Sequence, residues 1–210
     1  MDSIIVFGAG GRAGRRVVAE AVRRGHRVTS VVRDVSRYPD LGGTLVSGDV
    51  TDPAAVAALA KGHDAAVHAA ALVGVPDFFT AAARALTGGL VEAGVPRLVG
   101  IGVGTALEVA PGVPMHDTAD FPAEYRDFSR AHAAQIEVLR AADERLDWVL
   151  LVPPPTLLDD ASAGTGHYRT GAGQVLPAGD GLFPYADLAL AVVDEAEAPR
   201  HHRAVVAIGH

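Results

Sequence analysis

Three glycines near the beginning of the chain, at positions 8, 11 and 14, have the spacing of a phosphate-binding turn. They lie in the segment Ile4-Ile5-Val6-Phe7-Gly8-Ala9-Gly10-Gly11-Arg12-Ala13-Gly14, between an apolar run and a helical pattern. Glycines in such a turn let a pyrophosphate approach the main chain and let the helix pack closely on the strand. The free N–H groups at the start of the helix then bind phosphate oxygens. Because a second apolar run follows at Arg27–Val32, the segment predicts dinucleotide binding rather than a simple turn.

The residues that end the second apolar run bear on which dinucleotide binds. An acidic residue there hydrogen-bonds the ribose 2′-hydroxyl of NAD, whereas an arginine accommodates the 2′-phosphate of NADP. This chain has Arg33 followed by Asp34, and Arg12 lies in the glycine turn within reach of the same phosphate. Two guanidinium groups around one dianion favour NADP. Asp34 could instead serve NAD, so NAD stays possible.

Two further groups of residues are expected at the same edge of the sheet. Asp49 and Val50 follow the third predicted strand. The carboxylate can accept a hydrogen bond from the adenine amino group, and the valine can pack on the ring. After the fourth strand, the small side chains of residues 69–71 would let a cofactor lie against the backbone. An alanine-rich core explains these three alanines almost as well.

Strand-like runs alternate with helical patterns along the chain. We expect strands at residues 4–7, 27–32, 44–49, 65–70, 97–102, 148–152 and 204–208, and helices at 12–24, 52–61, 78–93, 128–143 and 188–195. Asp52 suits a helix N-cap, and Gly25 and Gly94 suit left-handed C-terminal caps. The alternation predicts one α/β domain over residues 1–210, a Rossmann-type doubly wound parallel sheet of six or seven strands with helices on both faces.

Two segments interrupt this alternation. Residues 104–126 and 153–183 are rich in proline or glycine and follow the ends of strands, where ligands bind in open α/β sheets. Loops of this length in a compact domain are usually functional. We expect both to lie on the substrate side, the second as a small C-terminal lobe.

Composition excludes several classes of protein. The chain of 210 residues is 49% hydrophobic and 20% charged, which is typical of a globular protein. Its net charge of −7 argues against nucleic acid or an anionic membrane as partner. Cysteine is absent and no histidine–carboxylate grouping has metal-ligand spacing, so we expect no metal. With no leader and no apolar stretch of about 20 residues, we expect a cytoplasmic monomer or homodimer that acts on a small molecule.

Several motifs together resemble the atypical short-chain dehydrogenase/reductases. The glycine segment, Val-Val-Arg-Asp at 31–34 and Gly-Asp-Val-Thr-Asp at 48–52 are similar to the NmrA-like NAD(P)H-binding group, which includes the biliverdin-IXβ/flavin reductases. Segments at 127–132, 137–140, 146–148, 152–155 and 165–168 follow that group's order and spacing. The likeness covers nearly the whole chain. It implies a Rossmann-type sheet, bound NAD(P)H, and a nicotinamide near Pro153 and Pro154.

The chain departs from the wider superfamily at the residues that transfer protons. Superfamily dehydrogenases use a serine after the fifth strand and a Tyr-x-x-x-Lys on the next helix. Here Phe128 and His132 stand where the tyrosine and lysine would be, and no serine follows the fifth strand. The alcohol–ketone machinery is therefore missing. His132 is the best candidate proton donor, with contact to the nicotinamide ribose or no function as the alternatives.

Hydride transfer to a flavin, quinone or tetrapyrrole depends on alignment more than on a dedicated acid. The sequence therefore favours an NADPH-dependent reductase of a conjugated acceptor, with a non-catalytic NAD(P) redox sensor as the alternative. The catalytic candidate is His132. The expected cofactor contacts are Gly8, Gly10, Gly11, Arg12, Ala13, Arg33, Asp49, Val50, Ala69, Ala70, Ala71, Pro153 and Pro154.

Overall fold

An eight-stranded sheet forms the centre of the molecule in a computed structural model that describes residues 2–75, 77–156, 158–176 and 182–210. Its strand order is β3-β2-β1-β4-β5-β8-β10-β9. The strands are β1 (Ser3–Phe7), β2 (Arg27–Val32), β3 (Thr44–Ser47), β4 (Ala65–His68), β5 (Arg97–Ile101), β8 (Asp147–Val152), β9 (Arg169–Ala172) and β10 (Ala204–Gly209). All neighbours pair in parallel except β9 and β10. The strand order reverses between β1 and β4, which places a crevice at their carboxyl ends.

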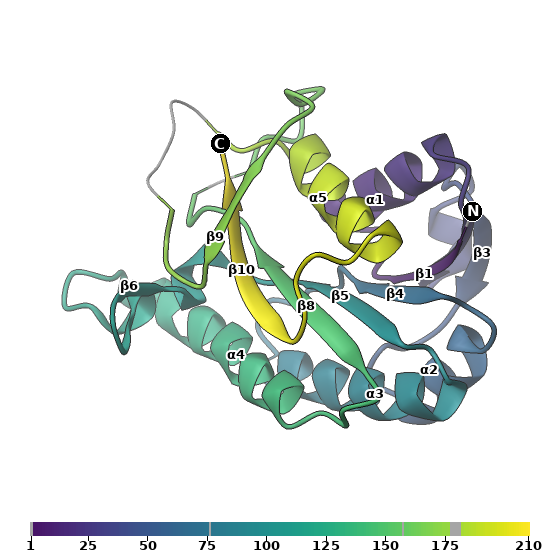
Figure 1. The fold of residues 1–210 in the computed structure, drawn as a ribbon, viewed down its shortest axis with the longest axis horizontal. Helices are drawn as coiled ribbons and strands as arrows, with labels where there is room; N and C mark the ends of the chain where they lie inside the picture. Colours follow the sequence, from purple (N-terminus) through teal and green to yellow (C-terminus); the bar gives the residue numbers. More distant parts are fainter. Residues whose placement is uncertain (1, 76, 157, 177–181) are drawn as a thin grey trace.

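Helices cover both faces of this sheet (Figure 1). Helices α1 (Arg12–Arg23) and α5 (Tyr185–Glu197) pack together on one face, and α2 (Pro53–Ala60), α3 (Phe78–Ala93) and α4 (Ala123–Arg140) pack on the other. Side chains alternate along β1, so Ile4 and Val6 join the core under α1 and α5, while Ile5 and Phe7 join the opposite core. Burial on both faces explains why β1 is a continuous apolar run. None of the described helices has the length and apolar character needed to span a bilayer.

The predicted helix ends are confirmed at three places. The carboxylate of Asp52 accepts hydrogen bonds from the N–H groups of Ala54 and Ala55, with Pro53 as the first residue of α2. Gly25 and Gly94 have φ angles of 85° and 73°, the left-handed conformation that ends a helix at low steric cost. These local signals set where the chain turns back toward the sheet.

The structure corrects three parts of the predicted fold. The sheet has eight strands rather than six or seven, and its edge strand β9 is antiparallel. This strand lies within the predicted loop 153–183, so at least this part of the expected lobe belongs to the main sheet. Its sequence, Arg-Thr-Gly-Ala, is short and largely exposed, so it carries no apolar pattern. Helix α4 begins at Ala123, five residues before the predicted start at 128, and α5 begins at Tyr185 instead of 188.

The segment 104–126 contains regular structure of its own. It holds three short elements, the 3₁₀ turns η2 (Gly104–Ala106) and η3 (Met115–Asp117) and a hairpin of β6 (Glu108–Ala110) and β7 (Val113–Pro114). The hairpin projects from the sheet near the start of α4 (Figure 1). Residues 157 and 177–181 of the second predicted loop lie outside the described residues.

Candidate functional site

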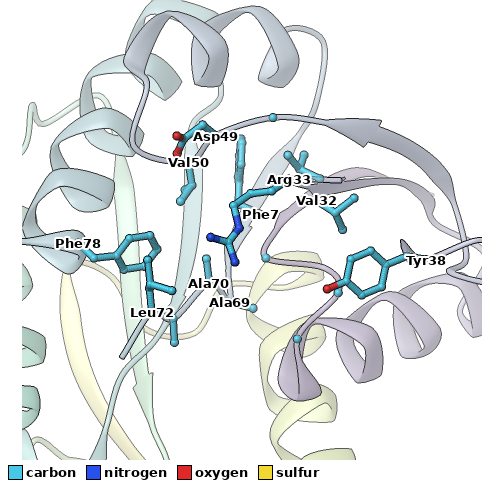
Figure 2. A pocket seen from close by; sticks show the side chains of 16 residues that line it. Phe7, Val32, Arg33, Tyr38, Asp49, Val50, Ala69, Ala70, Leu72 and Phe78 are labelled. Atoms are coloured by element: carbon cyan, nitrogen blue, oxygen red, sulfur yellow. The ribbon is translucent and has the colours of Figure 1, made fainter. Parts of the chain in front are cut away.

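A pocket of about 180 Å³ opens at the carboxyl ends of β1, β2, β3 and β4. Its walls come from the glycine turn, the segments after β2, β3 and β4, and the start of α3 (Figure 2). It is smaller than the roughly 300 Å³ that sites for drug-sized ligands usually reach, so it matches one half of a dinucleotide rather than all of it. The lining residues are Phe7, Gly8, Gly10, Gly11, Val31, Val32, Arg33, Tyr38, Gly48, Asp49, Val50, Ala69, Ala70, Ala71, Leu72 and Phe78.

The floor of the pocket is a glycine turn in which three chain segments meet. Gly8 has φ = 82°, and a methyl group built on it would lie 2.4 Å from the backbone nitrogen of Ala70. A methyl group on Gly14 would lie 2.1 Å from the carbonyl oxygen of Gly8. Only glycine permits both approaches. No side chain among the described residues caps the N-terminus of α1 at Gly11, so its first N–H groups stay available to an anion.

Arg33 and Asp34 point in different directions. The guanidinium of Arg33 extends into the pocket between Val50 and Tyr38 (Figure 2). Asp34 is not among the lining residues, because its carboxylate accepts hydrogen bonds from the N–H (3.0 Å) and hydroxyl (2.7 Å) of Ser36. These hydrogen bonds also lower the pKa of Asp34. The end of β2 therefore presents the guanidinium of Arg33 to the pocket, and not the carboxylate of Asp34.

Asp49 and Val50 form the opposite rim. The Asp49 carboxylate accepts hydrogen bonds from the N–H (2.9 Å) and hydroxyl (2.7 Å) of Thr51. Those bonds and the nearby charge of Arg33 hold the pKa of Asp49 below its usual value. Val50 is buried and faces the pocket, and Leu72 lies nearby with Phe78 (Figure 2). This side of the pocket is apolar and suits a flat ring.

The structure brings most of the predicted cofactor residues together. Those that line the pocket are Gly8, Gly10, Gly11, Arg33, Asp49, Val50, Ala69, Ala70 and Ala71. Arg12 and Ala13 do not line it and lie in the first turn of α1. Pro153 and Pro154 are also outside it, since they follow β8, which β5 separates from β4. Their contact with a cofactor stays a prediction.

Seven lining residues were not predicted from the sequence as contacts. Four of them belong to the predicted strands or directly follow one, and three do not: Phe7, Val31, Val32 and Gly48, and then Tyr38, Leu72 and Phe78. Tyr38 follows the 3₁₀ turn η1 (Val35–Arg37), and Leu72 lies in the connection before α3. No motif or periodicity marks these two positions. Phe78 begins α3, and its place at the strand-end edge is the one signal that could have indicated it.

The structure places His132, the candidate proton donor, in a buried position outside the pocket. The side chain lies on α4, with its ring centroid 3.7 Å from that of Phe79 and 4.8 Å from that of Phe128. Its Nδ1 lies 2.9 Å from the amide nitrogen of Gln135, which donates the hydrogen bond. Burial, together with the nearby His68, lowers the pKa of His132 to about 3. The imidazole is therefore neutral near pH 7, and its role as a proton donor stays a prediction.

The segment after β5 provides a hydroxyl, although it has no serine. Thr105 in η2 places its Oγ1 2.7 Å from the Oγ of Ser129 on α4. Ser129 in turn donates to the carbonyl oxygen of Tyr125 at 2.9 Å. Since the Ser129 proton is used there, Thr105 must donate to Ser129, which leaves its oxygen as an acceptor only. This pair therefore supplies no acid either.

A metal site is not evident in this part of the molecule. Over residues 2–75, 77–156, 158–176 and 182–210, no group of three or more histidine, aspartate or glutamate side chains could hold a metal ion.

Comparisons with known proteins agree with this geometry. A family model described as NAD(P)H-binding matches residues 8–199. The uncharacterised protein YwnB of Bacillus subtilis is 34% identical over 201 residues, which cover 93% of this chain and 92% of YwnB. A protein of Bacteroides thetaiotaomicron, provisionally named an epimerase, has a structure that is 27% identical with a TM-score of 0.89, covering 100% of this chain and 97% of its own.

A third similar structure shares the fold at lower identity. It is a protein of Streptococcus pneumoniae, provisionally named an NADH-flavin reductase, at 24% identity and a TM-score of 0.86, with 99% of each chain covered. The names of the two solved structures point to different reactions. The fold is thus shared by proteins whose names indicate different reactions.

Proposed function

The chain belongs to the NAD(P)H-binding family of atypical, NmrA-like short-chain dehydrogenase/reductases, and we propose that it is an NADPH-dependent reductase of a flat, conjugated acceptor such as a flavin or quinone. Membership gives it a nicotinamide dinucleotide as cofactor. The preference for NADPH and the nature of the acceptor are the proposal.

The pocket suits the adenosine half of that dinucleotide. Gly8 and Gly14 let the turn close against the backbone of Ala70 and against the start of α1, and the N-terminus of α1 presents N–H groups where a pyrophosphate would approach. Val50 and the alanines after β4 provide a surface for the adenine ring. When bound, the reduced nicotinamide supplies the hydride for the reaction. The residues described here would bind and orient the cofactor.

The contrast between Arg33 and Asp34 supports NADPH over NADH. Arg33 extends into the pocket, whereas the Asp34 carboxylate is engaged by Ser36. The two hydrogen bonds from Ser36, both to Oδ1, hold the Asp34 side chain away from the lining of the pocket. A guanidinium at this place instead binds a phosphate through charge-assisted hydrogen bonds.

The loss of the superfamily's proton-transferring side chains carries the proposal about the acceptor. Phe128 replaces the proton-transferring tyrosine of the superfamily, His132 is buried and neutral, and the Thr105 proton is engaged. Reduction of a ketone requires an acid at the carbonyl oxygen. A flavin or quinone accepts a hydride without one, because its conjugated ring spreads the charge and takes its proton from water. Positioning then supplies most of the catalysis.

Removing the Arg33 guanidinium should change cofactor preference. We expect Arg33→Ala to weaken NADPH binding by about 10- to 100-fold, since hydrogen bonds between charged groups contribute roughly 1.5–3 kcal/mol. NADH binding should change by less than about threefold, because NADH has no 2′-phosphate. Calorimetric titration of both cofactors measures the two effects. Arg145→Ala, an exposed arginine paired with Asp143 away from the pocket, is the matched control. Equal losses for NADPH and NADH would show that Arg33 does not bind the 2′-phosphate.

Turnover tests the proposed reaction directly. Purified protein mixed with NADPH and, separately, FMN, FAD or a soluble quinone should consume NADPH, followed by the absorbance of the reduced nicotinamide. Saturable turnover above the rate without protein is expected for at least one acceptor. If NADPH binds but no acceptor is reduced, the reductase proposal fails and the non-catalytic sensor becomes the better description.

A further inference from the structure

Tyr38 occupies a position that only a glycine at residue 10 allows. A methyl group built on Gly10 would lie 2.4 Å from Cζ and 2.5 Å from Cε1 of the Tyr38 ring. The ring therefore lies directly over the glycine turn. Its backbone is held by hydrogen bonds of 3.2 Å to the carbonyl oxygen of Val35 and from the N–H of Leu41. The ring thus packs against Gly10 from a backbone that is hydrogen-bonded on both sides.

The Tyr38 hydroxyl faces the pocket. In Figure 2 it points toward the interior from the side opposite Asp49 and Val50, with the guanidinium of Arg33 between them. None of the hydrogen bonds among the described residues involves this hydroxyl, so its proton is available to a ligand. A donor aimed into a pocket with no partner of its own is what recognition of an anion requires.

The Arg33 guanidinium separates two unlike parts of the pocket. On one side lie Val50, Leu72 and Phe78, which are apolar and suit a purine ring. On the other side lie Tyr38 and Gly10, which offer a phenol and exposed backbone. In a ligand whose ribose links a purine to a phosphate monoester, the purine would lie in the apolar part and the phosphate would lie beside Tyr38 and Gly10.

We propose that Tyr38 determines cofactor specificity, with its hydroxyl and the Arg33 guanidinium as the two donors of a subsite for the 2′-phosphate of the dinucleotide. The inference rests on the proposed function, because it takes a nicotinamide dinucleotide as the ligand of this pocket. The phenol donates its proton to one phosphate oxygen and Arg33 binds others, so that both donors act on the same charge. The lack of a side chain at Gly10 then has two effects. It leaves the turn open to the cofactor, and it leaves space for the Tyr38 ring.

The test uses four probes that differ in the 2′-phosphate and in the nicotinamide: NADPH, NADH, 2′,5′-ADP and 5′-AMP. Tyr38→Phe keeps the ring on Gly10 and removes the hydroxyl alone. We expect it to weaken binding of NADPH and 2′,5′-ADP by about 10- to 100-fold, the loss of one hydrogen bond to a charged group, and to leave the affinities for NADH and 5′-AMP within about twofold. Tyr125→Phe, an exposed tyrosine on α4, should change none of the four dissociation constants.

The outcomes separate this inference from the proposed function. If Tyr38→Phe weakens probes with and without the 2′-phosphate equally, or weakens none of them, Tyr38 does not have the proposed role. In that case, binding of NADPH by the wild type would still support the proposed cofactor. A wild-type chain that binds none of the four probes would overturn both. Because Tyr38→Phe conserves the packing of the ring, circular dichroism and thermal unfolding like those of the wild type are expected. A variant that does not fold is replaced by Tyr38→Leu, for which the same phosphate-selective loss is required.

Discussion

Alanine in place of Gly14 is expected to weaken NADPH binding by roughly 30-fold or more. The added methyl group would lie 2.1 Å from the carbonyl oxygen of Gly8 and 2.8 Å from the Cα of Ala9, and both are backbone atoms that cannot rotate away. The carbonyl of Gly8 also accepts the N–H of Gly11 at 3.1 Å, so moving it opens the turn. Overpacking of this kind costs about 1–3 kcal/mol, and 2 kcal/mol corresponds to about 30-fold in Kd.

A second helical glycine provides the control. Gly88 lies in α3 with no atom within 4 Å of a built methyl group and with no left-handed φ. Gly88→Ala should leave the Kd for NADPH unchanged and stabilise the protein by up to about 1 kcal/mol through helix propensity. Calorimetric titration gives the affinities, and urea unfolding followed by the fluorescence of Trp148, the one tryptophan, gives the stabilities. If both alanine variants bind NADPH like the wild type, the close approach at Gly14 has no part in shaping the cofactor site.

Glutamine in place of Glu195 is expected to lower the free energy of unfolding by about 3 kcal/mol. This is the lower end of the usual cost of leaving one partner of a buried ion pair alone, because Arg97 keeps the carboxylate of Asp147 at 2.7 Å. Glu195 on α5 is 1% exposed and Arg97 at the start of β5 is 4% exposed, and their side chains are joined at 2.8 Å. Burial opposes ionisation of Glu195, but hydrogen bonds from His201 and the backbone N–H of Arg200 hold its pKa below the usual value. The carboxylate is therefore charged at neutral pH, and its loss leaves Arg97 with a weaker set of partners.

An exposed ion pair serves as the matched control for this effect. Glu137 and Arg140 on α4 are joined at 2.6 Å but are both largely in solvent. Glu137→Gln should change stability by less than about 1 kcal/mol. Cofactor affinity should be unaffected in every folded variant. Arg97 lies at the amino end of β5, whereas the pocket lies at the carboxyl ends of the strands. Should Glu195→Gln not fold, Arg97→Met combined with Glu195→Leu removes both charges and should recover much of the loss. Similar stabilities of Glu195→Gln and Glu137→Gln would contradict this account.

The elements that could be predicted are those whose signal is local. The apolar run at 4–7, the glycine turn and the N-cap Asp52 each determine their geometry within a few residues, and the structure has β1, α1 and α2 where these patterns place them. The first turn of α4 and the strand β9 were missed for the opposite reason. Residues 123–127 are polar and mostly exposed, and Arg169–Ala172 forms a strand only because β10 offers it an edge to pair with.

Within the candidate site, the same division holds. Arg33, Asp49 and the alanines after β4 could be placed at the pocket because the carboxyl ends of parallel strands meet at one edge. Tyr38 and Leu72 could not, since they come from irregular connections whose path depends on the surfaces beneath them. From the sequence, Gly10 was predicted only to contact the cofactor. Its contact with Tyr38 could not be predicted, because the two residues come from segments that lie apart in the chain.

By itself, the sequence determined the kind of cofactor and the loss of the superfamily's tyrosine, because a strand–glycine turn–helix motif and the identity of Phe128 are properties of short segments. Only the tertiary structure decided what surrounds each titratable group. His132 has the composition and helix position of a proton donor, but Phe79 from another helix covers its ring and burial lowers its pKa to about 3. Burial and hydrogen-bond partners arise from residues far apart in the chain, so the orientations of Arg33, Asp34 and His132 could be known only after the chain was folded.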